Sequence, residues 1–182
     1  MSIPQNIWRF QSEIVNKRKA QTNQGMKREQ YPHGAAILTN KKNTSMIGGI
    51  GYNHYPSNSH GFKGTIHAEI DAFQRNYTKI GRKKVSILVV RTNGGNSRPC
   101  SNCIRNMVDN SQMRVKRVYY TIDNGNIVSE NLKQLSANCD QHLSMYYRSL
   151  RDGTLNGSGN LDEMSEDDPE SAKPYIFHTP IT

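Results

Sequence analysis

Apolar residues recur at helical and strand spacings through the first 150 residues of the chain. Ile7, Phe10 and Ile14 fall on one side of a helix, which predicts an amphipathic helix near the N-terminus. Two short apolar runs, 34–38 and 46–50, flank a polar segment and predict a hairpin. The pattern then predicts a helix over 67–76, a strand over 84–92, a helix over 100–109, a strand over 115–122, a short strand over 126–128 and a helix over 130–150.

The order of these elements indicates the class of fold. Strands alternate with helices in the later part of the pattern, which is typical of an α/β protein with a mixed sheet and helices on both faces. Residues 151–182 differ, because they are rich in Gly, Ser and Asn and contain an acidic stretch from Asp162 to Glu170. Such a segment buries too little apolar surface to offset its chain entropy. We therefore expect one domain over residues 1–150 and an acidic, disordered tail over 151–182.

The charge is unevenly distributed between these two parts. The whole chain has 24 Lys and Arg against 15 Asp and Glu, a net charge of +9, but the tail alone carries −5 and the first 150 residues carry +14. A positive excess attracts phosphate-bearing ligands or nucleic acid without specifying which. A basic surface that only aids solubility is the alternative interpretation.

The sequence also bears on location and on the use of cysteine. No apolar run approaches the length that spans a bilayer, and the N-terminus lacks the features of a secretion signal. We expect no membrane partner and an intracellular, cytoplasmic protein, with a nuclear location also open. Three cysteines, an odd number, argue against a disulfide framework and leave metal binding or free thiols.

Two short motifs fall where helices are predicted to begin: His67-Ala68-Glu69 and Pro99-Cys100-Ser101-Asn102-Cys103. Two cysteines three residues apart at a helix start project to the same side, where the helix dipole stabilises the thiolates that bind zinc. Together with His67 they would supply three protein ligands and leave the fourth position to water, as in catalytic zinc sites. Taken singly, the motifs have ordinary structural interpretations: a hydrogen-bonded histidine, an acidic residue in a first helical turn and a pair of core cysteines.

Glu69 can share this site only under one geometric condition. Residues two apart in a regular helix point about 200° away from each other. His67 and Glu69 therefore meet only if the helix is just beginning at this point. The site is predicted to lie between two helix N-termini.

H-x-E followed by P-C-x-x-C is the signature of zinc nucleobase deaminases. Over about residues 30–123 the chain resembles the cytidine and deoxycytidylate deaminase superfamily. The segment from Gly49 to Pro56 is similar to the G-Y-N-G-x-P segment of deoxycytidylate deaminases in particular, and the segment from Arg114 to Tyr120 resembles the strand that follows their P-C-x-x-C helix. The resemblance implies a three-layer α/β/α fold with a five-stranded mixed sheet, and a homo-oligomer.

The resemblance also implies a cofactor and residue roles. Zn²⁺ would be held by His67, Cys100 and Cys103, and Glu69 would be the catalytic residue that takes a proton from the activated water and returns it to the ring and the departing ammonia. The substrate-binding residues expected from the matched segments are Asn53, Ala68, Pro99, Ser101 and Tyr120, with Tyr119 as an alternative to Tyr120.

The chain departs from the family pattern at two places that border the expected pocket. The segment from Thr92 to Pro99 is several residues longer than the family's T-L-x-P-C link, and His54 stands where deoxycytidylate deaminases usually have Gly. The interval before His67 lacks the ligands of a second zinc seen in some relatives. We therefore predict a single metal.

The leading hypothesis is hydrolytic deamination of a small pyrimidine nucleotide or nucleoside, of the deoxycytidylate or cytidine type, to the uracil form with release of ammonia. A second is deamination of cytosine or adenine in single-stranded DNA or RNA, and a third is a non-catalytic, zinc-stabilised module that binds nucleic acid. For the second, the candidate backbone contacts are Arg98, Lys63 and the first helix, and the candidate stacking residues are Tyr52, His54, Tyr55 and Phe62.

Overall fold

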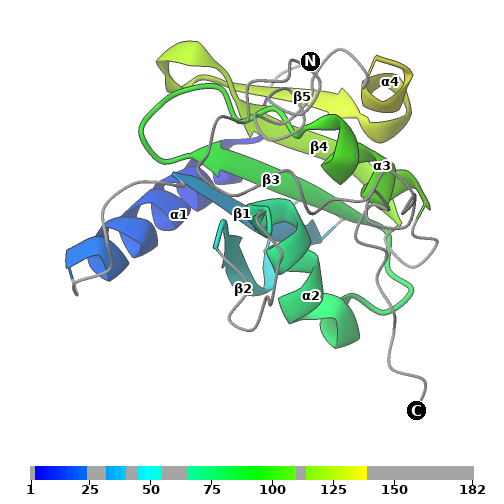
Figure 1. The fold of residues 1–182 in the computed structure, drawn as a ribbon, viewed down its shortest axis with the longest axis horizontal. Helices are drawn as coiled ribbons and strands as arrows, with labels where there is room; N and C mark the ends of the chain where they lie inside the picture. Colours follow the sequence, from blue (N-terminus) through cyan, green and yellow to red (C-terminus); the bar gives the residue numbers. More distant parts are fainter. Residues whose placement is uncertain (1–2, 24–31, 40–44, 55–64, 110–113, 139–182) are drawn as a thin grey trace, which may run out of the picture.

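The computed structural model describes residues 3–23, 32–39, 45–54, 65–109 and 114–138 (Figure 1). The predicted acidic tail over 151–182 and the predicted helical residues 139–150 lie outside this part of the chain. So do Tyr55, Phe62 and Lys63, which the nucleic-acid hypothesis uses.

Five strands form one mixed sheet. The elements in chain order are α1 (Gln5–Asn23), β1 (His33–Thr39), β2 (Met46–Tyr52), α2 (Ala68–Ile80), β3 (Val85–Arg91), α3 (Ser101–Asp109), β4 (Val115–Thr121), the 3-10 turn η1 (Asp123–Gly125), β5 (Ile127–Asn131) and α4 (Leu132–Ala137). The strand order is β2-β1-β3-β4-β5, with β3 and β4 parallel and the other neighbours antiparallel. The predicted α/β class, mixed sheet and hairpin are confirmed.

Each face of the sheet carries its own apolar core, because successive side chains of a strand point to opposite faces. Ala35, Ile37 and Val89 belong to a cluster that α2, α3 and α4 cover. Ala36 and Leu88 belong to a second cluster, covered by α1 through the buried residues predicted for its inner side. The helices therefore lie on both faces, and the three-layer α/β/α architecture is confirmed (Figure 1).

Helix α2 is fixed tightly against the edge strand β2. A Cβ added at Gly51 would overlap backbone atoms of Ala72 and Ala68, so the two backbones approach as closely as glycine permits. The fully buried Asn76 adds two hydrogen bonds: its Oδ1 accepts from Gly49 N at 2.8 Å and its Nδ2 donates to Gly49 O at 2.7 Å. These contacts set where α2 begins relative to the end of β2.

The end of the described chain corrects one prediction. Residue 130 does not begin a helix: Ile127–Asn131 is the strand β5, in which Glu130 pairs with Val118 of β4. Helix α4 starts at Leu132, where Asn131 Oδ1 accepts a hydrogen bond from Lys133 N at 3.0 Å. The prediction was wrong because pairing with β4 is a long-range interaction that local periodicity does not report.

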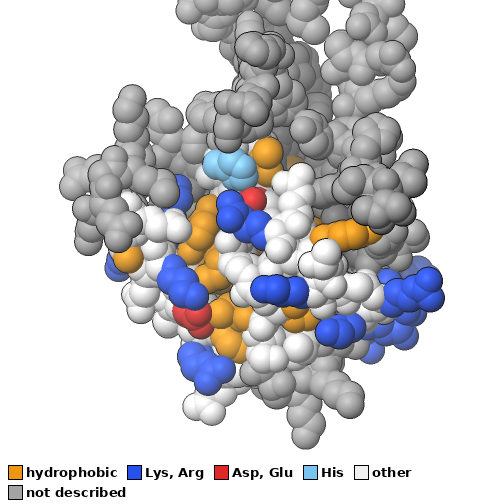
Figure 2. Space-filling view, turned by 90° about the horizontal axis from the view of Figure 1, so that it is seen from below, with side chains coloured by type: hydrophobic (Ala, Val, Ile, Leu, Met, Phe, Trp, Pro, Cys, Tyr) orange, Lys and Arg blue, Asp and Glu red, His pale blue; other side chains and the backbone are white. Residues whose placement is uncertain are grey.

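Two surface properties complete the description. Figure 2 shows Lys and Arg side chains spread over one described face, with few Asp and Glu among them. In the described ranges, no helix is both long and apolar enough to cross a membrane.

Candidate metal centre and active site

The two motifs meet because β2 and β3 run in the same direction, each antiparallel to β1, and therefore end on the same side of the sheet. An isolated bridge joins His54 and Ile66, with N–O distances of 3.1 and 2.8 Å, and so returns the chain beside β2 directly before His67. Cys100 follows the loop that leaves β3 and directly precedes α3. Both motifs therefore stand at helix N-termini, as predicted.

The three predicted ligands converge. His67 Nδ1 lies 3.5 Å from Cys100 Sγ and 3.3 Å from Cys103 Sγ, and all three ligand atoms lie within 4.8 Å of one another. A tetrahedral zinc with ordinary Zn–N and Zn–S bonds separates its nitrogen and sulfur ligands by about 3.6 Å. The spacing and the mixed nitrogen and thiolate donors thus fit the His-Cys-Cys zinc site of a deaminase without rearrangement.

The start of α2 meets the geometric condition for Glu69. His67 is the N-cap residue, with an extended backbone at φ −76° and ψ 152°, and the helix begins at Ala68. Glu69 is 5% exposed and hydrogen-bonds with the Cys103 side chain. Its carboxyl group therefore shares the site with the ligands even though only one residue separates it from His67.

The three ligand side chains shift one another's pKa values. The hydrogen bond from Cys103 holds the pKa of Cys100 well below its usual range despite burial, and the same bond raises the pKa of Cys103. Burial lowers the pKa of His67, but the hydrogen bond and negative charge of Cys100 outweigh it and raise this pKa to about 9. Burial raises the pKa of Glu69, which favours a carboxyl group that both takes up and releases a proton.

Three of the predicted substrate-binding residues adjoin the metal ligands along the chain, and Asn53 contacts one of these three. Asn53 Oδ1 accepts a hydrogen bond from Ala68 N at 2.7 Å, which ties the end of β2 to the first turn of α2. Ala68 is fully buried in the core. Pro99 and Ser101 are buried on either side of Cys100.

The two candidate tyrosines, Tyr119 and Tyr120, both lie buried in the apolar cores of the sheet. Tyr120 is 7% exposed in the core, and its hydroxyl donates to Glu130 of β5. Burial, together with this bond, raises the pKa of Tyr120 to about 12. Tyr119 belongs to the cluster on the α1 face, opposite to that of Cys100.

Sequence reasoning missed His33, the first residue of β1. Burial, with the positive charges of Arg91 and His67, lowers the pKa of His33 to about 4, so this imidazole is neutral beside the metal ligands. A single histidine ahead of an apolar run gives no local signal. Only the pairing of β1 with β3, which sets His33 opposite Arg91, brings it to the site.

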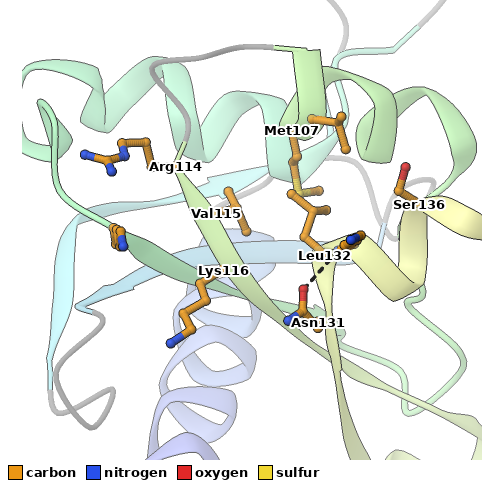
Figure 3. Close-up of a pocket in the computed structure, with 10 residues that line it drawn as sticks. Met107, Arg114, Val115, Lys116, Asn131, Leu132 and Ser136 are labelled. Atoms are coloured by element: carbon orange, nitrogen blue, oxygen red, sulfur yellow. Dashed lines mark hydrogen bonds between the residues drawn. The ribbon is translucent and has the colours of Figure 1, made fainter.

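A separate cavity of about 560 Å³ lies between α3, α4 and the starts of β3 and β4 (Figure 3). Its lining includes Lys84, Met107, Arg114, Lys116, Leu132 and Lys133. The metal ligands stand at the other ends of these strands, and open α/β sheets bind their ligands at the carboxyl ends of parallel strands. The metal centre, and not this cavity, is therefore the candidate site of reaction.

Comparison with known families agrees with this site. Residues 10–122 match the family described as the cytidine and deoxycytidylate deaminase zinc-binding region, which spans the His67 and Cys100–Cys103 motifs. The chain belongs to this family.

Solved structures of both kinds of deaminase are similar to the chain at low identity. They include cytidine deaminases from Burkholderia pseudomallei (21% identity, 68% of this chain and 94% of that one, TM-score 0.47) and Mycobacterium leprae (18%, 69% and 92%, TM-score 0.44). A dCMP deaminase from the cyanophage S-TIM5, in complex with dCMP and dUMP, is 17% identical over 65% of this chain and 82% of that one, with a TM-score of 0.42. No curated protein matches the chain.

Proposed function

We propose that this protein is a zinc-dependent hydrolase that converts a free cytosine nucleotide or nucleoside to its uracil form and releases ammonia. The observation that carries the proposal is the buried Glu69 beside a three-ligand cluster of His67, Cys100 and Cys103. Three protein ligands are typical of a catalytic zinc, because the fourth position then stays open to the reactants.

The residues of the site have separate roles in the proposed deamination. Zinc in such a centre supplies Lewis-acid activation of water near neutral pH. Glu69 accepts a proton from that water, donates it to the ring, and then assists the departure of the amino group from C4. The water oxygen replaces the amino nitrogen, so water and a cytosine give a uracil and ammonia. Asn53 orients the substrate through its Nδ2, because its Oδ1 already accepts from Ala68 N.

Deoxycytidylate is the favoured substrate within this class. The segment from Gly49 to Pro56 resembles that of deoxycytidylate deaminases. The net charge of +14 over the first 150 residues also suits a phosphorylated substrate. A homo-oligomer belongs to the same proposal and rests on the family resemblance.

An ammonia-release assay on zinc-loaded protein tests the proposal. The substrates are cytidine, deoxycytidine, their monophosphates and adenosine. We expect activity on cytosine compounds, and a fall of about 10²- to 10⁴-fold in Glu69→Gln with unchanged zinc content. Glu13→Gln, which changes an acid on α1 at a distance from the site, is the matched control. Full activity of Glu69→Gln, or no ammonia from any pyrimidine, would overturn the assignment.

Deamination of single-stranded DNA or RNA is the second candidate function. The basic surface in Figure 2 and the position of Arg98 two residues before Cys100 support it. Its distinguishing measurement is the mobility of short oligonucleotides with the protein at two salt concentrations. The absence of binding at low salt would exclude this candidate.

A further inference from the structure

The cavity between α3, α4 and the starts of β3 and β4 combines apolar surface with positive charge (Figure 3). Its apolar lining consists of the buried Met107 and Leu132, the half-buried Val115 and the exposed Val108. Its charged lining residues are all basic and all exposed: Lys84, Arg114, Lys116 and Lys133. No Asp or Glu of the described chain lines the cavity. Such a surface suits a ligand that carries negative charge and some apolar groups.

The fold brings these four cations together from separate parts of the chain. Lys84 directly precedes β3, and Lys133 lies in the first turn of α4. Val85 pairs with Val115 but the next residue of β3 pairs with Arg117, so Lys116 is the extra residue of a β-bulge, a feature that re-aims side chains. The ion pairs given for the described residues, Lys17–Glu13 and Arg75–Asp71, include none of the four. Like charges around one cavity repel, and an anionic ligand would relieve this repulsion.

The chain leaves the described fold beside this cavity. Ser136 of α4 lines the cavity, and the described chain ends two residues later at Asn138. The acidic stretch from Asp162 to Glu170 begins 24 residues after Asn138, and 24 extended residues span up to about 80 Å. The stretch is therefore within reach of the cavity. A segment tethered in this way has an effective concentration on the order of millimolar, so an affinity too weak to capture a free peptide suffices.

The acidic stretch matches the cavity in charge and in apolar content. Residues 162–170 contain no Lys or Arg and six acidic residues: Asp162, Glu163, Glu166, Asp167, Asp168 and Glu170. Leu161 and Met164 supply apolar side chains within the same stretch. A polynucleotide has the same sign of charge, but no aromatic residue that could stack on a base lines the cavity in the described chain. The acidic stretch is therefore the better match.

We propose that residues 161–170 of this chain bind in the cavity between α3 and α4, with their carboxylates against its four cations and their apolar side chains against its apolar lining. A segment too polar to fold alone can become ordered against a partner surface, which here belongs to the same chain. The metal ligands stand at the other ends of the strands, so the bound segment leaves the metal centre open. This inference does not depend on the proposed deamination.

Carbodiimide cross-linking of the full-length protein tests the proposal, because this reagent joins a lysine amine to a carboxylate in contact with it, with loss of water. Mass spectrometry identifies the joined peptides at ionic strengths of about 0.01 M and about 1 M, where the Debye length is about 30 Å and about 3 Å. We expect the three cavity lysines to couple to residues 162–170 at low ionic strength, and the yield to fall at least about threefold at high ionic strength. Lys19, exposed on α1 at the opposite face of the sheet, is the internal reference and should couple less.

A charge reversal tests the same contact without removing a lysine. Arg114→Glu should lower the yield from Lys116 and Lys133 about 2- to 30-fold, because it replaces an attractive charge with a repulsive one. The matched control is Arg9→Glu, at an exposed position on α1, which should change the yield less than about twofold. Unchanged yield in Arg114→Glu, or coupling of Lys19 equal to that of the cavity lysines, overturns the proposal.

Isotope mixing and a competitor distinguish the other occupants. Equal amounts of ¹⁵N-labelled and unlabelled protein are unfolded in urea, refolded together and then cross-linked. Cross-links within like-labelled pairs support binding within one chain, whereas mixed labels in half of the cross-links would show binding to a second copy and overturn the proposal. Loss of the cross-links on addition of one equivalent of a short single-stranded oligonucleotide would also overturn it, because the cavity would then prefer nucleic acid.

Discussion

Asn53 makes a hydrogen bond that stabilises the fold and also has a proposed role in substrate binding. Two substitutions at this position can test the two roles separately. Its Oδ1 accepts a hydrogen bond from Ala68 N at 2.7 Å, at the first turn of the helix that carries Glu69. Asn53→Ala removes this acceptor. Loss of an acceptor at a helix start costs about 0.5–2 kcal/mol. For a domain of this size that lowers Tm by about 1–8 °C.

Asn53→Asp should behave differently. A carboxylate keeps an oxygen acceptor for Ala68 N, and negative charge at a helix N-terminus stabilises by about 0.3–1 kcal/mol. The substitution does remove the amide N–H donor. Leaving a buried hydrogen-bonding group unpaired costs about 1–3 kcal/mol, so kcat/KM should fall about 5- to 150-fold while Tm stays within about 2 °C of the original.

The assay pairs thermal unfolding with steady-state deamination of deoxycytidylate. Asn16→Asp, at an exposed position on α1, is the matched control and should change neither quantity. The reasoning is refuted if Asn53→Asp destabilises the protein as much as Asn53→Ala, or if it keeps full kcat/KM.

Two further predictions concern stability. Asn76→Ala removes three hydrogen bonds, two to Gly49 of β2 and one to Ala72 O, and should lower the free energy of unfolding by about 1–3 kcal/mol in urea denaturation. Gln74→Ala, at an exposed position on the same helix, should change it by less than about 0.5 kcal/mol, and equal effects would argue against the bridging role of Asn76. The pKa of His33 is about 4 in the folded protein against 6.5 when unperturbed, so the unfolded chain takes up this proton first as pH falls. The contribution of His33 to the free energy of unfolding is therefore complete above pH 6.5 and declines toward pH 4. His33→Gln should therefore lose less stability between pH 7.5 and pH 5 than the unsubstituted protein, and an identical loss would exclude this origin of acid sensitivity.

The site ligands were predictable from sequence because their geometry is local. The spacing of Cys100 and Cys103 sets both on one side of a helix start, and the one-residue gap between His67 and Glu69 requires a helix that begins between them. The structure has both features. Most elements were predictable for the same reason, since their apolar periodicity reports which side faces a core.

Long-range pairing explains what local patterns did not reveal. The pairing of Glu130 with Val118 makes β5 longer than its apolar run suggests. His33 reaches the metal centre only because β1 lies between β2 and β3, an order that no local pattern encodes. One local signal for the true start of α4 was present: Asn131 is a residue favoured at helix N-caps, and it caps that helix.

Anomalous X-ray scattering at the zinc edge, from crystals of the zinc-loaded protein, tests the central claim most directly. The account predicts one ion bound by His67 Nδ1, Cys100 Sγ and Cys103 Sγ at about 2.0–2.3 Å, with a non-protein atom in the fourth position and the Glu69 carboxyl group beside it. An ion bound elsewhere, or one enclosed by a fourth protein ligand, would contradict it.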